Sequence, residues 1–512
     1  MNGFPLLTLL TLFPVAAGAA VLLLGRSPGR AKGLALVGSL VSLALAVSLW
    51  AGFNPASGDY QFVEQHRWIP GMGVNYFLGV DGLGLVMVLL SAILVPMAIL
   101  ASPSATSNPS LYFSLILFLQ SGLFGAFSAL NFFHWFLFWE LGLVPAFFLA
   151  RLWGGEGRAA AATQFFVYTM AGSVAMLLGF LAIFLATGMF DFPALAEVAR
   201  NGGLASLLAS KVGWPGVGTL VFAGVLLGLA VKVPLVPFHT WLPPLYAEAP
   251  SAVTMLLTGA MSKMGVYGFI RILLPLFLPQ LRAASTLLLV LAVITIVGAA
   301  WAAFAQRDLK RILAYSSINH LGYCLLAIFA VVRATPPGAS LAGDKVAALS
   351  GAIFQMFNHG ITAGALFWFV ALIEKRSGGL RGLDDFGGLR KPAPVLCGLM
   401  GIALFSSLGL PGLNGFIGEF LIFKGAFPLA PCASTLSTVG LLVTAVFILT
   451  LLQKVFNGPL NPAWSGFPDL TVAERLSLAP VLGLMLVLGV YPQALAGLIN
   501  HTVVRMVENL NL

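Results

Sequence analysis

The stretch "LAVKVPLVPFHTWLPP", residues 229–244, sets one lysine, Lys232, directly before a run of prolines. Each proline removes a backbone amide donor, and its ring clashes with the carbonyl four residues earlier in a helix. Pro234, Pro237 and Pro243 therefore predict that a long apolar helix breaks just after Lys232. Broken backbone at membrane depth survives only inside protein or beside a water-filled cavity. The stretch predicts an interrupted transmembrane helix with local hydration around a lysine.

The composition of the whole chain is that of a membrane protein with many spans. Of its 512 residues, 59% are hydrophobic and 8% are charged, against about 45–50% and about 25% in soluble domains. Apolar runs near the spanning length of about 20 residues recur along the chain. We predict an all-α integral membrane protein with about fourteen transmembrane helices. The predicted spans are residues 5–25, 33–52, 78–101, 111–130, 132–150, 162–187, 217–247, 251–275, 284–305, 309–332, 349–373, 393–426, 433–456 and 476–498.

A second interruption is predicted within 393–426, in "SSLGLPGLNGFIGEFLIF", residues 406–423. Pro411 and several glycines loosen the helix around Glu419. The two interrupted helices are the seventh and the twelfth, and a shift of five helices reverses the orientation of a unit in the membrane. Paired interruptions of this kind indicate a transport site between inverted repeats. We predict inverted five-helix repeats from helices 4–8 (residues 111–275) and helices 9–13 (284–456), preceded by helices 1–3 (1–110) and followed by helix 14 and a tail (457–512).

The basic residues predict the orientation of the chain. One set of alternate loops carries about 15 Lys and Arg and the other about 8, with Lys310 counted in the richer set and Arg271 in the poorer set. The richer set is expected to be cytoplasmic. An even number of helices then places both termini on the outer side. The net charge of +9 is scattered over alternate loops, which argues against nucleic-acid binding, since that needs one basic face.

No cofactor site is predicted within this chain. Cys324, Cys397 and Cys432 are widely spaced, and no CxxC motif is present. This spacing argues against iron–sulfur clusters and structural zinc. A GxGxxG motif after a strand and a P-loop are also absent from the sequence.

A small set of ionisable residues falls within the predicted spans. A charge at the centre of a membrane helix costs about 2.5–3.5 kcal/mol on insertion scales. Each such residue therefore needs a function or an interaction partner that offsets this cost. The set is Glu140, Lys232, Lys263, His320, His359, Glu419 and Lys424. Lys424, near a helix end, is expected to snorkel to the interface, and His134 to pack at one. The other histidines are open to a second interpretation as neutral contacts between helices. For Glu140, Lys232, Lys263 and Glu419 we favour function over a structural ion pair.

Several motifs resemble, in order, those of one family. The motifs are "GVDGLGLVMVLL", "FWELGLVPAFFL", "LWGG", "AATQFFVYTMAGS", "VKVPLVPFHTWLP", "EAPSAVTMLLTGAMSKMGVYGFIRI", "QRDLKRILAYSSINHLGY", "IFQMFNHGITAGALF" and "GLPGLNGFIGEF". They resemble the proton-pumping, antiporter-like membrane subunits of respiratory complex I. The resemblance covers nearly the whole chain. One departure is Pro244, Leu245 and Tyr246, where members commonly read Asp-Ala-His.

The resemblance implies roles for six residues in proton translocation: Glu140, Lys232, Lys263, His320, His359 and Glu419. It implies that Glu140 pairs with Lys232 and biases its affinity for a proton. Burial disfavours a charged lysine and a nearby carboxylate favours it, so movement of Glu140 would switch Lys232 between holding and releasing a proton. Protons are then expected to pass along Lys263, His320, His359 and Glu419, in that order. Glu419 is implied to be the outward terminal site, where sister subunits usually carry a lysine.

The resemblance also implies partners, because nothing in this chain supplies energy. Partner subunits are expected to carry FMN and iron–sulfur clusters, to oxidise NAD(P)H and to reduce quinone. Further antiporter-like chains are expected on either side, within a bacterial inner membrane or a thylakoid membrane. Two alternatives stay open: a subunit of a cation/proton antiporter, and the membrane subunit of a related hydrogenase or CO2-uptake complex.

Overall fold

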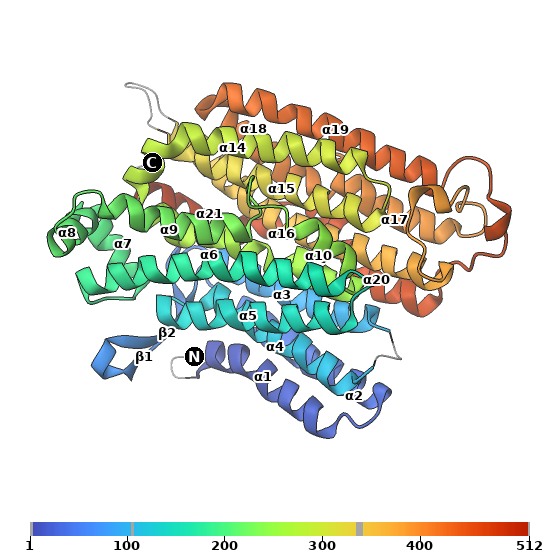
Figure 1. Cartoon of the computed structure of the whole chain (residues 1–512), viewed down its shortest axis with the longest axis horizontal. Helices are drawn as coiled ribbons and strands as arrows, with labels where there is room; N and C mark the ends of the chain where they lie inside the picture. Colours follow the sequence, from blue (N-terminus) through green and yellow to red (C-terminus); the bar gives the residue numbers. More distant parts are fainter. Residues whose placement is uncertain (1–3, 104–106, 334–340, 510–512) are drawn as a thin grey trace.

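The computed structural model describes residues 4–103, 107–333 and 341–509, and its long helices run along one axis of the molecule (Figure 1). Within the described residues, twelve helices are long and apolar enough to cross a membrane. They are α1 (Leu6–Leu24), α2 (Pro28–Ala51), α3 (Gly82–Ala101), α4 (Pro109–Ser128), α5 (Phe132–Trp153), α6 (Arg158–Thr187), α11 to α13 together (Ser251–Leu276), α14 (Leu278–Ala305), α15 (Leu309–Val331), α16 (Ala342–Ser377), α19 (Pro431–Val455) and α20 (Val472–Val490). The predicted all-α membrane fold is confirmed.

Both predicted interruptions are present. The first separates α9 (Val217–Lys232) from α10 (Leu242–Glu248), and the second separates α17 (Pro394–Ser407) from α18 (Asn414–Leu429). Across the described residues, twelve helices qualify as spans, or thirteen if the bent pair Gly203–Val212 and Val217–Lys232 is counted as one span. The sequence predicts about fourteen.

Polar groups freed by the first interruption find partners inside the protein. The indole Nε1 of Trp241 donates to the carbonyl of Val231 at 3.0 Å. The backbone N–H of Val236 donates to Oγ1 of Thr295, on α14, at 3.1 Å. Unpaired backbone groups cost several kcal/mol in an apolar medium. The break is therefore a specified structure and not a frayed helix end.

One end of the bundle carries elements that the sequence analysis missed (Figure 1). An antiparallel hairpin of β1 (Gln61–Ile69) and β2 (Val74–Val80) precedes α3, so the predicted helix start at residue 78 is wrong. Asp81 ends the strand and caps α3 by accepting from the N–H of Gly84 at 3.0 Å. Short helices α7 (Phe192–Arg200) and α8 (Gly203–Val212) lie at the same end. A search for apolar runs of spanning length passes over such short elements.

The last predicted helix, 476–498, is also corrected. The chain forms α20 and then, after Tyr491 and Pro492, a separate helix α21 (Gln493–Asn509). Pro492 cannot donate to the preceding turn, which favours the break there. Helix α21 packs against α3 and α16.

The segment Ser251–Leu276 occupies the centre of the bundle, and its most apolar window is fully buried. It contains two π turns, η2 (Leu257–Met261) and η3 (Phe269–Leu273), with α12 (Lys263–Gly268) between them. Such turns interrupt the regular helix and are frequent at functional sites. Gly259 of this segment faces Gly360 of α16 so closely that a side chain at either position would meet the other's backbone oxygen. Small residues thus allow these two helices to approach.

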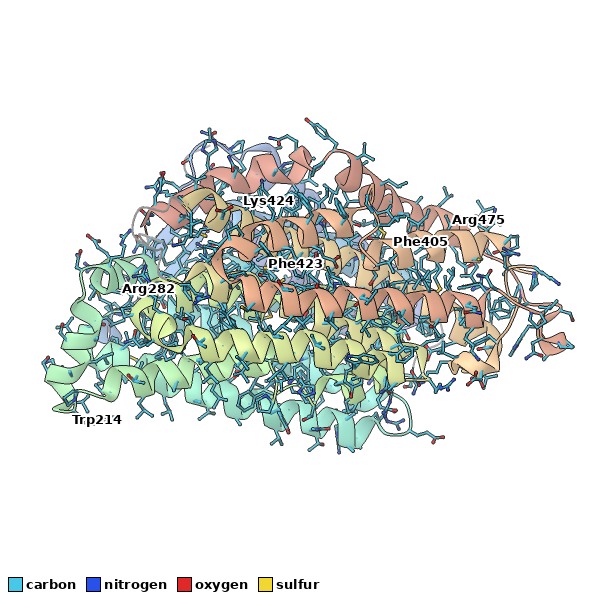
Figure 2. The ribbon with its side chains drawn as sticks, turned by 90° about the horizontal axis from the view of Figure 1, so that it is seen from above. Trp214, Arg282, Phe405, Phe423, Lys424 and Arg475 are labelled. Atoms are coloured by element: carbon cyan, nitrogen blue, oxygen red, sulfur yellow. The ribbon has the colours of Figure 1, made fainter. Side chains whose placement is uncertain are left out.

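Three residues counted as loop charges are buried inside helices instead. Arg271, on η3, is 6% exposed and forms an ion pair with Asp81, Nη2 to Oδ1, at 2.5 Å. Lys310, on α15, is 3% exposed, and Lys345, on α16, is 1% exposed. One residue leaves the richer set of loops and two leave the poorer set, so the same set stays richer in Lys and Arg. Figure 2 shows Trp214 and Arg475, from opposite sets of loops, at opposite ends of the bundle.

Candidate functional site

Four of the predicted site residues come together in a buried polar line. Lys263 Nζ lies 2.6 Å from His359 Nδ1. The rings of His359 and His320 are 5.1 Å apart between centroids. His320 Nδ1 lies 3.2 Å from Glu419 Oε1. The four residues come from four helices, α12, α16, α15 and α18, and none is more than 7% exposed.

The order along this line corrects the predicted one. His359 lies beside Lys263, and His320 lies beside Glu419, so the line runs Lys263, His359, His320, Glu419. Helices α15 and α16 pack against each other and both pack against α18, so only the side-chain distances give the order. Position in the sequence therefore does not give position along the line.

The imidazole of His320 has two competing partners on one nitrogen. Nδ1 lies 3.0 Å from Nε2 of Gln355 and 3.2 Å from the carboxylate of Glu419, while Nε2 lies 3.3 Å from Ser407 Oγ. An amide NH2 only donates, and an ionised carboxylate only accepts. Nδ1 accepts from Gln355 when it carries no proton and donates to Glu419 when it carries one. Both protonation states of this nitrogen thus have a partner already in place.

The second helix break holds the carboxylate of Glu419. Gly409, inside the break, has φ +80°, and a side chain there would collide with the carboxylate of Glu419. Only glycine meets both conditions without strain. The start of α18 is tied down, since Asn414 O accepts from Asn358 Nδ2 at 2.6 Å and Asn414 Oδ1 accepts from Ser406 Oγ at 2.5 Å. Hydrogen bonds to α16 and α17 therefore fix the backbone at the start of α18.

Lys263 is held by the π turn that precedes it. Its Nζ donates to the carbonyl of Thr258 and to Oγ of Ser262, the latter at 3.3 Å. Oγ1 of Thr258 lies 2.9 Å from Oγ of Ser317 on α15. Hydroxyls, a carbonyl and one imidazole therefore surround this amine.

Glu140 and Lys232 form a second group, next to the first helix break. Nζ of Lys232 lies 4.9 Å from the centre of the Trp139 ring, and Glu140 is the next residue of α5. Over the part of the chain that the structure describes, the two residues make no ion pair within 4.0 Å, and neither the amine nor the carboxylate oxygens have a hydrogen-bond partner. Glu140 and Lys232 therefore lie in the same region but form no ion pair in this structure.

A small cavity connects this group with Lys263. Its volume is about 10 Å³, and Lys232, Trp241, Tyr246 and Ser262 are among the residues that line it. That volume is roughly the room needed for one water molecule. Ser262 also touches Lys263, so one bridging water would complete a hydrogen-bonded route from Lys232 to the polar line.

Two other candidates lie off the line, as expected. Lys424 is exposed and neighbours Phe423 on α18 (Figure 2). His134 is 4% exposed, and its ring packs 4.5 Å from that of Tyr76 and 4.9 Å from that of Phe138. Among the described residues, no group of three or more His, Cys, Asp or Glu is placed to hold a metal ion.

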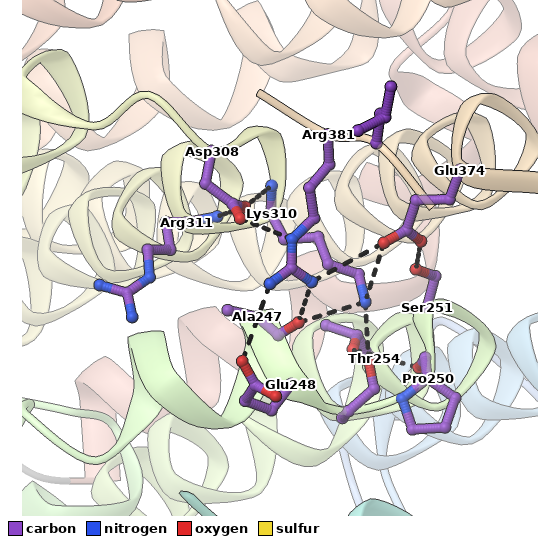
Figure 3. A network of polar contacts seen from close by, with 12 residues as sticks. Ala247, Glu248, Pro250, Ser251, Thr254, Asp308, Lys310, Arg311, Glu374 and Arg381 are labelled. Carbon is purple, nitrogen blue, oxygen red and sulfur yellow. Dashed lines mark hydrogen bonds and ion pairs between the residues drawn. The ribbon is translucent and has the colours of Figure 1, made fainter. Parts of the chain in front are cut away.

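A charge network at the end of the bundle opposite the β hairpin escaped the sequence analysis (Figure 3). Arg381 Nε lies 2.6 Å from Asp308 Oδ2, and its Nη1 donates to the carbonyl of Ala247 at 2.6 Å. The other members of the network are Glu248, Lys310 and Glu374. Asp308 and Lys310 are close in sequence, but their partners come from α10, α16 and the chain after α16. No local pattern could have revealed the network.

The comparisons with known proteins identify the family. Residues 129–448 match the family described as "NADH:quinone oxidoreductase/Mrp antiporter, TM", and residues 60–126 match "NADH-ubiquinone oxidoreductase chain 4, amino terminus". The chain belongs to this family of antiporter-like membrane subunits. The resemblance that the motifs indicate is thereby confirmed.

Individual relatives agree along nearly the full length. The chain is 35% identical over 510 residues to NADH-quinone oxidoreductase subunit M of Rhodobacter capsulatus, covering 98% of this chain and 96% of that one. It is 35% identical over 496 residues to F(420)H(2) dehydrogenase subunit M of Methanosarcina mazei, covering 95% of each. A chain of respiratory complex I from Thermus thermophilus with bound NADH has the same fold, with a TM-score of 0.84, 30% identity and coverage of 98% and 99%. A chain of the Mrp complex from Dietzia, at 21% identity and TM-score 0.82, with 98% of each chain covered, shows the fold alone.

Proposed function

We propose that this chain is the proton-translocating membrane subunit of an NAD(P)H:quinone oxidoreductase. The observation that carries the proposal is the buried line Lys263, His359, His320 and Glu419, whose neighbours are within hydrogen-bonding or ring-contact distance. Ionisable groups inside a membrane protein are costly and mark ion pathways. Relatives named NADH-quinone oxidoreductase subunit M, which match along nearly their whole length, support the same assignment.

Loading of the line begins at Lys232. A carboxylate that approaches a buried lysine favours its protonated form, and withdrawal favours release. Glu140 stands apart from Lys232 in this structure, which corresponds to the releasing arrangement. The released proton passes through the one-water cavity to Ser262 and then to the amine of Lys263.

Transfer along the line uses the two histidines. Lys263 gives its proton to Nδ1 of His359, and the neighbouring His320 receives it next. Nδ1 of His320 then exchanges Gln355 for Glu419 as its partner and delivers the proton to the carboxylate. Histidine suits this task because its unperturbed pKa lies near 6.5. Glu419 lies beyond the second break, in the half of the twelfth span that leads outward in the orientation inferred from Lys and Arg.

The energy comes from partner subunits. We infer that these carry FMN and iron–sulfur clusters, oxidise NAD(P)H and reduce quinone, while this chain performs no redox step. Further antiporter-like chains would flank it within a bacterial inner membrane or a thylakoid membrane, with both termini on the outer side. The relationship to multi-subunit complexes supports partners of this kind.

The chemistry of the line favours protons over a metal cation. Hard cations are bound by several oxygen ligands, whereas three of the four groups here are nitrogen bases. A lysine and two histidines repel a cation when charged and bind protons when neutral. The alternative of a Na⁺-carrying antiporter therefore has less support.

The test is proton pumping by the intact complex in sealed vesicles, divided by electron transfer to quinone. Lys232→Ala should abolish or severely reduce this ratio in an assembled complex. Lys424→Ala removes a lysine that is exposed and off the line, and serves as the matched control. Normal pumping by Lys232→Ala would remove Lys232 from the mechanism.

A further inference from the structure

Lys310 is buried although it stands at the very start of α15. It is 3% exposed, and its Nζ donates to the carbonyl of Ala249 at 2.8 Å. The nearest carboxylate oxygen is Oε1 of Glu374, at 3.6 Å. The side chain of Glu374 is 21% exposed, so Glu374 meets water on one side and Lys310 on the other (Figure 3).

The ion network does not need Lys310 to hold the helices together. Arg381 already contacts Asp308, the carbonyl of Ala247, Glu248 and Glu374, and so joins the ends of α10, α15 and α16. Its guanidinium cannot release a proton in a protein, whereas a lysine amine can. Arg381 is thus a permanent cation that joins the helices, whereas Lys310 is a cation that can release its proton.

A row of hydroxyls leads inward from Lys310. The carbonyl of Ala249 that accepts from Lys310 also accepts from Oγ1 of Thr254, at 3.4 Å. Thr254, Thr258 and Ser262 follow at intervals of four residues, so they share one face with about 5–6 Å between neighbours. One water molecule can bridge such a step.

A second row converges on the same place. On α15, Ser317 follows Lys310 by two helical turns on the same face. Oγ of Ser317 lies 2.9 Å from Oγ1 of Thr258, and the carbonyl of Thr258 accepts from Nζ of Lys263. Leu313 and Ala314, both buried, lie between Lys310 and Ser317 on that face.

We propose that Glu374 and Lys310 form a proton-uptake route from the surface at this end of the bundle to Lys263, by way of Thr254, Thr258 and Ser317. The route rests on the proposed proton-translocating function and is separate from the one through Lys232. A proton from water binds the carboxylate of Glu374 and passes to the neutral amine of Lys310. Each hydroxyl then accepts one proton and gives up another. Ser262, the next hydroxyl after Thr258, lies with its Oγ 3.3 Å from Nζ of Lys263 and passes the last proton to the neutral amine.

The decisive variants are Lys310→Arg and Lys310→Met in the intact complex. Arginine keeps the positive charge and the ion pair but does not release its proton. If Lys310 had only a structural role, Lys310→Arg would pump like wild type. On our proposal, both variants lower protons pumped per electron below wild type, and Lys263→Ala, which blocks both routes, lowers them further. Arg311→Met is the matched control, because Arg311 is exposed and points away from the network (Figure 3).

Thr258→Val and Thr258→Ser test the route without touching a charge. Valine keeps the shape of threonine and removes the hydroxyl, so it should lose pumping, whereas serine should keep it. Wild-type pumping by Lys310→Arg or by Thr258→Val overturns the uptake route. Lys263→Ala in the same assay separates the two proposals. If it pumps normally, the proposed function fails; if it stops pumping while the Lys310 and Thr258 variants pump normally, only the uptake route fails.

Discussion

His320 Nδ1 and Glu419 Oε1 lie 3.2 Å apart, which joins the polar centre of α15 to the carboxylate of the broken twelfth span. A single contact thus connects the imidazole on α15 with the carboxylate on α18. The pair forms the last internal step of the line, and it is the most direct place to interrupt transfer without disturbing loading.

Glu419→Gln is expected to block release of protons. The amide keeps the size of the side chain but cannot exchange a proton. Protons pumped per electron should fall well below wild type, while Glu419→Lys should retain more pumping, because a buried amine can also cycle a proton. Glu197→Gln, on the exposed face of α7, is the control. The exit assignment fails if the Gln variant pumps like wild type.

Glu140 and Lys232 are expected to act as one unit. Glu140→Gln removes the charge that biases the lysine, so its loss of pumping should approach that of Lys232→Ala. The double variant should be little worse than either single variant, since effects of groups acting together are not additive. The measurement is the same ratio of protons to electrons. If the loss of pumping in the double variant equals the product of the two single losses, Glu140 and Lys232 act as independent sites.

Gly409→Ala is expected to destabilise the second break. The backbone there has φ +80°, which costs a non-glycine residue about 1–2 kcal/mol, and the added methyl group would push the carboxylate of Glu419 away. The thermal midpoint and the pumping ratio should both fall. Gly398→Ala, in regular helix with open space around it, should leave both unchanged or raise stability slightly. Equal behaviour of the two variants would contradict the explanation.

The buried ion pair of Arg271 and Asp81 allows a test of stability. Arg271→Met leaves the carboxylate of Asp81 buried without its partner, which typically costs about 3–5 kcal/mol. Adding Asp81→Asn removes that charge and keeps an oxygen to cap α3, so the double variant should regain part of the loss. Thermal unfolding of the purified complex measures both. A double variant less stable than the single would show that the pair itself contributes more than charge compensation.

Local backbone chemistry was sufficient for much of this structure. Prolines after Lys232, and Pro411 with its glycines before Glu419, cannot continue a helix whatever surrounds them, and both breaks lie where they were predicted. Apolar runs of spanning length predicted the long helices, because a membrane leaves few other solutions for such segments. The rarity of ionisable residues in these runs selected seven residues, and the family resemblance reduced them to the six predicted for the site.

Only the tertiary structure decided which of these residues touch. Lys263 lies beside His359 and not beside His320, although α15 and α16 both pack against α12. Lys310 reads as an ordinary loop cation in the sequence, and only the convergence of α10, α15 and α16 buries it next to Glu374. Periodicity and hydropathy report how each helix meets an apolar or polar environment. They do not show which helices pack against one another. The proton line consists of contacts between residues on four different helices, so only the tertiary structure reveals it.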